Sequence, residues 1–490
     1  MGAPATVNRA AAQDPAVGSM NGWMNGWIGL GTLGSVGIAV LGTTIGAIPR
    51  PSPDEFWFHV SGGGYTTAHV GFYFSVALLV GAWAGVGVGA RRGRLTQPRC
   101  WVILALWGLP LFLGPPVFSR DLYSYIAQGL LAHHGLNPYH VAPSALGNGP
   151  LLESIATVWR HTASPYGPFF VMVSRAAVTV AGNSLLAQIL VFRVAELLGV
   201  AAIMVFLPRL ARRLGTDPGL ALWLGVLSPL ALFSFIASGH NDALMVGLLV
   251  AGVALAMDGR FAVGVALCAL AALIKLPAAL AIVFLAVAQY QAASETERRR
   301  VLLKAVLVPC LVVVAGTLLA GYGWTWLGPA ALRVPAELRV LATPAVSLGV
   351  FFHAIVHGVG IPVSTGAVVS TAQVVCALVV AAGTLWLIWN VRRLDVVRAM
   401  GLALVLVVVG SPTLWPWYLT WGVTLLAATT AQRSKFLAVV AGLAMLVVGA
   451  GGSPMLNGLA YAITAPLLLA GCAWFFWNRH WQTVVSGHAS

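Results

Sequence analysis

Apolar runs of about 20 residues recur from one end of the chain to the other, and a helix of that length spans the hydrocarbon core of a bilayer. Only 8% of the 490 residues are charged, whereas a soluble chain carries roughly a quarter. No long polar domain interrupts the apolar runs. The sequence therefore predicts an all-α polytopic membrane protein.

The positions of the runs predict about 13–14 transmembrane helices in one domain at 27–480. A flexible cytoplasmic tail is expected at 1–26, which lacks the apolar core of a signal peptide, and a second cytoplasmic tail at 481–490. Lys275 and Pro277 interrupt one apolar stretch, so the two spans on either side of them are the weakest of the predicted spans. The expected spans are 27–47, 71–90, 98–116, 184–208, 219–236, 240–257, 261–275, 277–291, 301–320, 365–390, 397–411, 416–430, 435–450 and 458–477.

The net charge of +14 reflects basic clusters between the spans. Because positive loops stay in the cytoplasm, these clusters orient the chain and give no reason to expect nucleic-acid binding. The five cysteines are scattered singly, which indicates neither a zinc site nor a disulfide framework. The clusters lie at 91–94, 209–213, 297–300, 392–393 and 433–435.

This orientation places two long segments, 117–183 and 321–364, on the outer face. Within the first, residues 167–182 are apolar but short and carry Arg175 midway. If they crossed the bilayer, the basic cluster at 209–213 would move outside, so we expect an interfacial helix.

Polar chemistry is concentrated in the stretch Pro115–Pro143, "PPVFSRDLYSYIAQGLLAHHGLNPYHVAP". Asp121 follows a predicted span directly, and ionisable residues at such depth are costly and usually functional. Helix capping by Asp121, or pairing with Arg120, is the alternative. His133 and His134 adjoin the glycine that ends the predicted helix, so helix termination is favoured over a metal site.

A second motif, "SGHND" at 238–242, opens an apolar span on the same face. Either Asn241 or Asp242 could merely cap this span. Three successive polar side chains, which include His240, exceed what capping needs and indicate a second wall of a polar cavity.

Lys275 is the only lysine within an apolar core segment. It either snorkels to the interface or faces a cavity and holds an anion. Arg120, Arg333 and Arg339 are expected at the same level, and such a cation cluster suits a lipid phosphate.

The segment "TLWPWYLTW" at 413–421 concentrates aromatic rings. An aromatic belt at the membrane interface explains this composition as well as stacking on a sugar ring or packing along a polyprenyl tail does. Pro412 and Pro416 break the helix there and open room.

Taken in order, "SRDLYSYIAQGLLAHHGLNPY", "SPYGPFF" at 164–170 and "SGHNDALMVGLL" resemble the GT-C glycosyltransferases that use lipid-phosphate sugars. More closely, they resemble the actinobacterial polyprenol-phosphate-mannose-dependent α-1,6-mannosyltransferases, the lipomannan enzymes of A and B type. The likeness extends over about residues 27–480.

The resemblance implies a multi-pass plasma-membrane enzyme with its active site on the extracytoplasmic face. It would transfer mannose from polyprenyl-phosphate-mannose to a phosphatidylinositol mannoside or lipomannan acceptor, with inversion. Asp121 would be the general base, and Lys275 with the loop arginines would hold the phosphate. The candidate substrate-binding residues are Arg120, Tyr123, Tyr166, His240, Asn241, Asp242, Lys275, Arg333, Trp415 and Trp417.

Other functions stay open at this point. Polar residues in a bundle with proline-broken helices also describe a secondary transporter of a lipid or polar solute. A transferase of another polyprenyl-phosphate sugar and a non-enzymatic lipid-binding protein are further alternatives. No cofactor is expected, and a divalent metal stays open.

Overall fold

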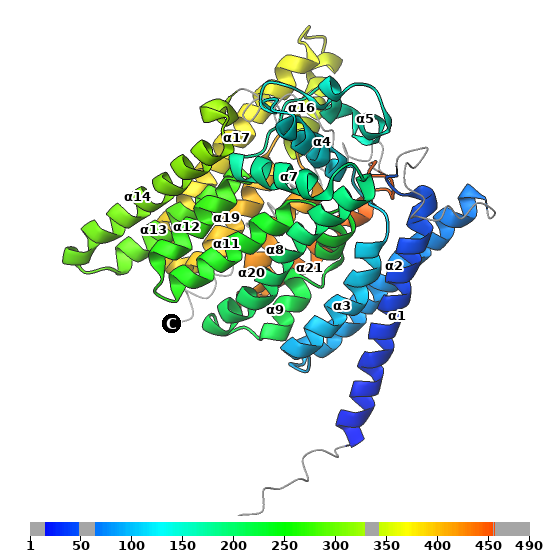
Figure 1. Cartoon of the computed structure of the whole chain (residues 1–490). Helices are drawn as coiled ribbons and strands as arrows, with labels where there is room; N and C mark the ends of the chain where they lie inside the picture. The colour runs from blue at the N-terminus through cyan, green and yellow to red at the C-terminus, as the bar shows by residue number, and fades with distance from the viewer. Residues whose placement is uncertain (1–14, 49–63, 329–342, 454, 456–490) are drawn as a thin grey trace, which may run out of the picture.

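The computed structural model describes residues 15–48, 64–328, 343–453 and 455, and these ranges form helices and no strand. Figure 1 shows long helices side by side, with short helices lying across one end of the bundle. The helix-only architecture confirms the expectation of an all-α fold.

Five described helices are long and apolar enough to cross a membrane. A sixth span arises if α9 (Pro218–Gly225) is joined to the helical segment Pro229–Ala237, which is bent by 49° from it. The multi-pass membrane character is therefore confirmed. The five long helices are α1 (Pro15–Ile45), α2 (Tyr65–Arg91), α8 (Leu185–Arg213), α14 (Glu295–Ala320) and α17 (Thr365–Trp389).

Most other expected spans coincide with shorter helices, and the span expected at 458–477 lies outside the described residues. The full count of about 13–14 spans stays a prediction. The shorter helices are α3 (Gln97–Leu113), α11 (Asp242–Met257), α12 (Phe261–Ala272), α13 (Leu280–Ala292), α19 (Val396–Gly410), α20 (Thr420–Ala427) and α21 (Gln432–Gly442).

One boundary differs from the expectation at the N-terminal end. Helix α1 begins at Pro15, so residues 15–26 are helical, although they were expected within a flexible tail. Met24 is fully buried, and its Cε atom lies 3.0 Å from the position a Cβ would take at Gly89 of α2. Met24, within the segment that was expected to be flexible, is therefore packed against α2.

The apolar stretch around Lys275 is broken into two helices, as expected. Helix α12 ends at Ala272, and a 3-10 turn at Leu276–Ala279 precedes α13. Lys275 itself is extended, with φ −141° and ψ 124°. Pro277 removes a backbone donor, and residues before proline avoid the helical region.

Helix α7 (Pro168–Ala181) is the segment expected to lie at the interface. Its 14 residues give a length of about 21 Å, short of the roughly 30 Å hydrocarbon core. Figure 1 shows it crossing the end of the bundle beside α4 (Asp121–His133). Arg175 is exposed, which agrees with an interfacial position.

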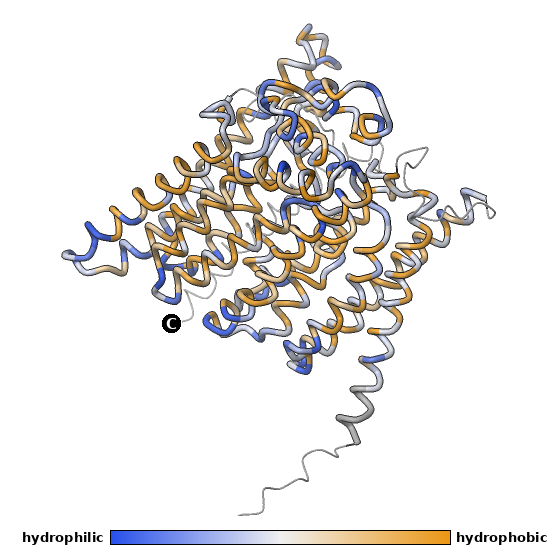
Figure 2. The backbone as a smooth tube through the Cα atoms, viewed as in Figure 1, coloured by the Kyte–Doolittle hydropathy of each residue, from blue (hydrophilic) through white to orange (hydrophobic). Residues whose placement is uncertain are grey.

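The two segments expected on one face do meet where both are described. Asn137 donates from Nδ2 to Thr325 Oγ1 at 3.3 Å, and Tyr322 donates to the Ala132 carbonyl at 3.4 Å. Three basic turns lie at the end of the bundle that is opposite to these two segments, and Figure 2 shows hydrophilic tips there. The turns join α2 to α3, α8 to α9, and α13 to α14.

Candidate active site

Helix α4 presents Asp121 as its first residue. The N-cap position is held by Arg120, and no side chain caps the helix. The backbone N–H of Asp121 donates to Ser119 Oγ at 3.1 Å. The Asp121 carboxylate is therefore not a helix cap, and the capping alternative is wrong.

One face of α4 turns its polar side chains toward the 238–242 turn. Asp121 and Tyr125 lie one helical turn apart and therefore share this face. Nδ1 of His240 lies 3.5 Å from Asp121 Oδ2 and 3.4 Å from the Tyr125 hydroxyl. Tyr125 also donates to Asn241 Oδ1 at 3.4 Å. The first and second sequence motifs thus form one site.

The 238–242 turn is fixed by its backbone geometry and by a contact of Ser238, and not by side-chain capping of α11. A π-helix at Leu232–Ala237 is followed by Ser238 and by Gly239, whose φ of 69° suits glycine. Ser238 Oγ donates to the Val117 carbonyl at 2.8 Å. Asn241 is the N-cap of α11 but makes no side-chain capping bond. Capping therefore does not account for this motif.

Asp242 forms a buried ion pair with Lys275. The Lys275 Nζ–Asp242 Oδ2 distance is 2.7 Å, and Trp421 Nε1 donates to Asp242 Oδ1 at 2.5 Å. The Lys275 ammonium also lies 4.8 Å from the centre of the Tyr418 ring and 5.7 Å from that of Tyr166. The lysine does not snorkel: 8% of it is exposed, and it faces the site.

A loop from the first outer segment secures this lysine. The backbone N–H of Gly167 donates to the Ile274 carbonyl at 3.1 Å, and that of Phe169 to the Leu273 carbonyl at 3.2 Å. Ser164 Oγ donates to Gln128 Oε1 on α4 at 2.8 Å. The "SPYGPFF" motif therefore joins the Lys275 break to α4.

The aromatic segment closes the opposite side of the site. Trp417 stacks on His240 at 4.1 Å between ring centres, and Trp415 stacks on Trp417 at 5.0 Å. Trp417 and Trp421 are only 3% and 5% exposed. The aromatic-belt alternative is wrong for these two rings, because they pack inside the protein and not against lipid.

Three buried polar atoms at the site lack a hydrogen-bond partner among the described residues: His240 Nε2, Asn241 Nδ2 and Trp417 Nε1. Unpaired buried donors and acceptors are costly and rare. These three atoms are free to hydrogen-bond a polar ligand or water.

Burial raises the pKa of the Asp121 carboxyl to about 7. The positive charge of Lys275 opposes this shift, whereas the negative charge of Asp242 adds to it. Hydrogen bonding from the Trp159 side chain also favours the ionised form. A carboxylate with a pKa near neutrality is suited to accept a proton.

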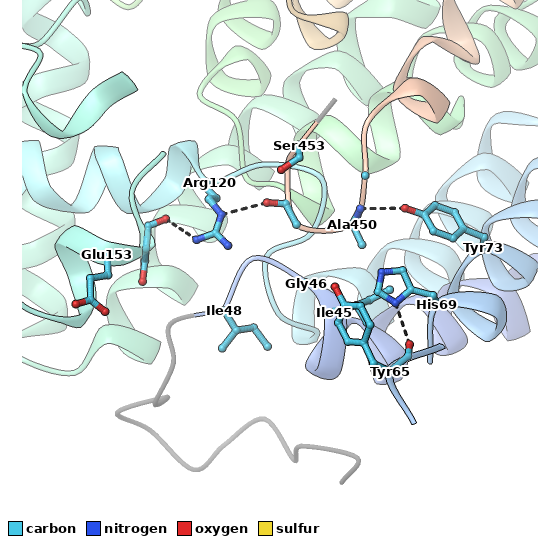
Figure 3. Close-up of a pocket in the computed structure, with 13 residues that line it drawn as sticks. Ile45, Gly46, Ile48, Tyr65, His69, Tyr73, Arg120, Glu153, Ala450 and Ser453 are labelled. Carbon is cyan, nitrogen blue, oxygen red and sulfur yellow. Dashed lines mark hydrogen bonds between the residues drawn. The ribbon is translucent and has the colours of Figure 1, made fainter. Parts of the chain in front are cut away.

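Of the three predicted arginines, only Arg120 lies within the described residues. Arg120 does not join the Asp121 cluster: it donates from Nε to the Gly451 carbonyl at 3.1 Å and from Nη1 to the Ser154 carbonyl at 3.2 Å. It lines a cavity of about 550 Å³ beside the cluster (Figure 3). Arg333 and Arg339 lie outside the described residues.

Tyr123 and His133 make structural contacts away from the Asp121 cluster. Tyr123 is fully buried and donates to the Ala47 carbonyl at the end of α1, so its predicted contact with substrate has no geometric support. His133 ends α4 and contacts Thr179 Oγ1 at 3.0 Å, and Gly135 has a φ of 76°. Helix termination accounts for the histidine pair.

Sequence reasoning missed two buried charges on α8. Arg193 donates to the carbonyls of Phe112, Gly114 and Ala237, and thereby ties α3 and the π-helix to α8. Glu196 accepts from the Leu244 N–H at 3.1 Å in the first turn of α11. The signal was available, since an arginine and a glutamate one turn apart inside an apolar span indicate a buried polar contact.

Comparisons with known proteins identify the class of protein to which this chain belongs. The family model described as "Alpha-(1->6)-mannopyranosyltransferase, N-terminal domain" matches residues 28–291, and "MptB C-terminal domain" matches 345–479. Alpha-(1->6)-mannopyranosyltransferase A of Mycobacterium tuberculosis is 32% identical over 91% of this chain and 89% of its own length. The comparison with solved structures found no match.

Two relatives from Corynebacterium glutamicum extend the comparison. Alpha-(1->6)-mannopyranosyltransferase A is 34% identical over 42% of this chain and 44% of that protein, and the B protein is 26% identical over 85% and 75%. Together with the fold and the buried acidic site, these similarities define a multi-pass membrane mannosyltransferase. The chain belongs to the alpha-(1->6)-mannopyranosyltransferase family. Because the family is one of mannosyltransferases, the transporter and the non-enzymatic lipid-binding protein are no longer needed as explanations.

Proposed function

We propose that the protein transfers mannose from polyprenyl-phosphate-mannose to a lipid-linked mannan, such as a phosphatidylinositol mannoside or lipomannan, and forms an α-1,6 linkage. The names of the relatives support the sugar and the linkage. The single observation that carries the mechanism is the buried Asp121 carboxylate, which faces His240 at 3.5 Å and has its pKa raised to about 7.

In the proposed reaction the acceptor 6-hydroxyl attacks the anomeric carbon of the donor. The new C–O bond forms as the bond from that carbon to the phosphate oxygen breaks, and the β-linked donor gives an α-linked product. Asp121 takes the hydroxyl proton, and polyprenyl phosphate leaves with the electron pair. Glycosidases need a second carboxyl to protonate their leaving group. A phosphate leaves as a stable anion, so one carboxylate suffices.

Lys275 remains the proposed partner of the donor phosphate. An ammonium has three N–H donors, and one of them is used by Asp242 at 2.7 Å. The remaining donors can serve a phosphate oxygen as negative charge develops on it. His240, Asn241 and Trp417 would then take sugar hydroxyls with the atoms that have no partner in the described part of the protein.

We further propose that the enzyme lies in the plasma membrane with this site on the extracytoplasmic face. The basic turns at the opposite ends of the helices support this orientation under the positive-inside rule. Cysteine labelling in intact cells tests it at Pro150, within the segment that covers the site. Reagent must reach Pro150→Cys from outside, and labelling only after the cells are opened would invert the proposed topology.

The function is tested with purified enzyme, polyprenyl-phosphate-mannose and a synthetic α-1,6-mannoside lipid. Formation of an α-1,6-linked product that depends on donor and is lost in Asp121→Asn supports the proposal. Transfer from a different polyprenyl-phosphate sugar, but not from the mannose donor, contradicts it.

A further inference from the structure

The cavity beside Arg120 is distinct from the cluster around Asp121. Its volume of about 550 Å³ falls within the usual range of ligand sites. Its walls come from the ends of α1 and α2, from the 449–453 loop and from the end of α5 (Pro150–Ser154). None of the proposed steps at Asp121 uses the groups of α2 that face this cavity.

Helix α2 contributes a row of rings to one wall. Tyr65, His69 and Tyr73 follow one another at every fourth position, so they share one helix face. The Tyr65 and His69 rings lie 4.1 Å apart, and the His69 and Tyr73 rings 6.4 Å apart. Nδ1 of His69 is within 2.9 Å of the Tyr65 carbonyl, which leaves Nε2 for the cavity.

The opposite wall carries charges of both signs. Figure 3 shows Arg120 and Glu153 on one side of the cavity, with Tyr65 and His69 on the other. Arg120 already donates to two carbonyl oxygens, which offset part of its positive charge. A carboxylate in the same wall repels a phosphate but accepts hydrogen bonds from hydroxyl groups.

We propose that this cavity binds the mannosyl chain of the acceptor, a neutral ligand rich in hydroxyl groups. Sugar rings present C–H faces that stack on the aromatic row, and their hydroxyls pair with Arg120, Glu153 and His69. Arg120, which lines the cavity, directly precedes Asp121 in the chain. The proposal rests on the proposed function for the identity of the acceptor.

The test measures binding of a soluble α-1,6-mannotriose to the full-length protein in nanodiscs, with no donor present. Wild type binds the mannotriose. Tyr65→Ala and His69→Ala each weaken binding about 5- to 10-fold, because each removes one ring of the row. Tyr65→Phe keeps the ring and binds as wild type does. Tyr290→Ala, the same change at the far end of α13, is the matched control.

Steady-state kinetics give a second readout. The Tyr65→Ala enzyme shows a raised KM for the mannoside acceptor and an unchanged KM for the donor. Mannotriose binding within twofold of wild type in both alanine variants overturns the proposal. Displacement of mannotriose by inorganic phosphate also overturns it, and assigns the cavity to the phosphate group instead. The binding test contains no donor and is therefore independent of catalysis. If mannotriose binds as expected but the activity assay shows no mannosyl transfer, the proposed function fails and the proposed binding site does not.

Discussion

The ammonium of Lys275 lies 2.7 Å from the carboxylate of Asp242, and this ion pair joins two breaks in the helical bundle. One break precedes the 3-10 turn at Leu276–Ala279, and the other precedes α11. Both charges are buried, so each depends on the other.

Removal of either partner is therefore expected to destabilise the protein. Lys275→Met leaves an unpaired buried carboxylate, which costs about 3–5 kcal/mol. The double variant Lys275→Met, Asp242→Asn removes both charges and should recover most of this loss. Thermal unfolding in detergent compares Lys275→Met, Asp242→Asn and the double variant with wild type. Equal losses in the single and double variants would show that the two side chains do not act as a pair.

Asp121→Asn should abolish transfer without harming the fold. Asparagine is nearly isosteric, and Asp121 makes no capping bond that the change could remove. Loss of a general base lowers kcat by about 10²–10⁴-fold. Asp242→Asn is the comparison, because it breaks an ion pair and should lower stability as well as rate. Near-normal turnover of Asp121→Asn would place the base elsewhere.

The pH dependence follows from the raised pKa of Asp121. The reaction needs the ionised carboxylate, so kcat/KM should fall as the pH drops below about 7. Stability has the opposite trend: protonation of the buried carboxyl stabilises the fold at low pH, and this contribution is lost as the pH rises through about 7. Asp121→Asn should consequently gain in melting temperature relative to wild type at pH 8 compared with pH 5. A pH-independent difference would contradict the assignment.

His240 is expected to act as a positioning residue. Its ring is held between Trp417, at 4.1 Å, and the Asp121 carboxylate, at 3.5 Å. His240→Ala removes this support, and misplacement of a reacting group by about 1 Å can cost 10²-fold in rate. The low-pH limb of kcat/KM should also move, because the surroundings of Asp121 change. A reduced rate with an unmoved pH profile would indicate a merely structural role.

Gly167 is expected to be intolerant of a side chain. A Cβ there would lie 2.2 Å from the Leu273 carbonyl oxygen, within the loop that secures Lys275. Gly167→Ala should lower the melting temperature and the rate together. Gly81→Ala is the matched control, because nothing lies within 4 Å of its Cβ position on α2. If the two variants had equal melting temperatures, the loop would be free to shift.

The sequence by itself determined the membrane class, most helix positions and the three polar motifs. Composition and the length of the apolar runs suffice for the membrane class and the helices, because few structures satisfy the backbone hydrogen bonds inside a bilayer. It also predicted the break at Lys275, since proline acts locally on the chain.

Only the tertiary structure decided how the polar residues pair. Lys275 pairs with Asp242, and Arg120 lines a separate cavity. Arg193 and Glu196 bind the backbone at helix ends. The spacing of these residues along the chain specifies none of these contacts. The physical reason is that a buried charge takes whichever partner the packing brings within reach, and those partners are distant in sequence. The burial of Met24 has the same origin, because it depends on a contact with Gly89 of α2.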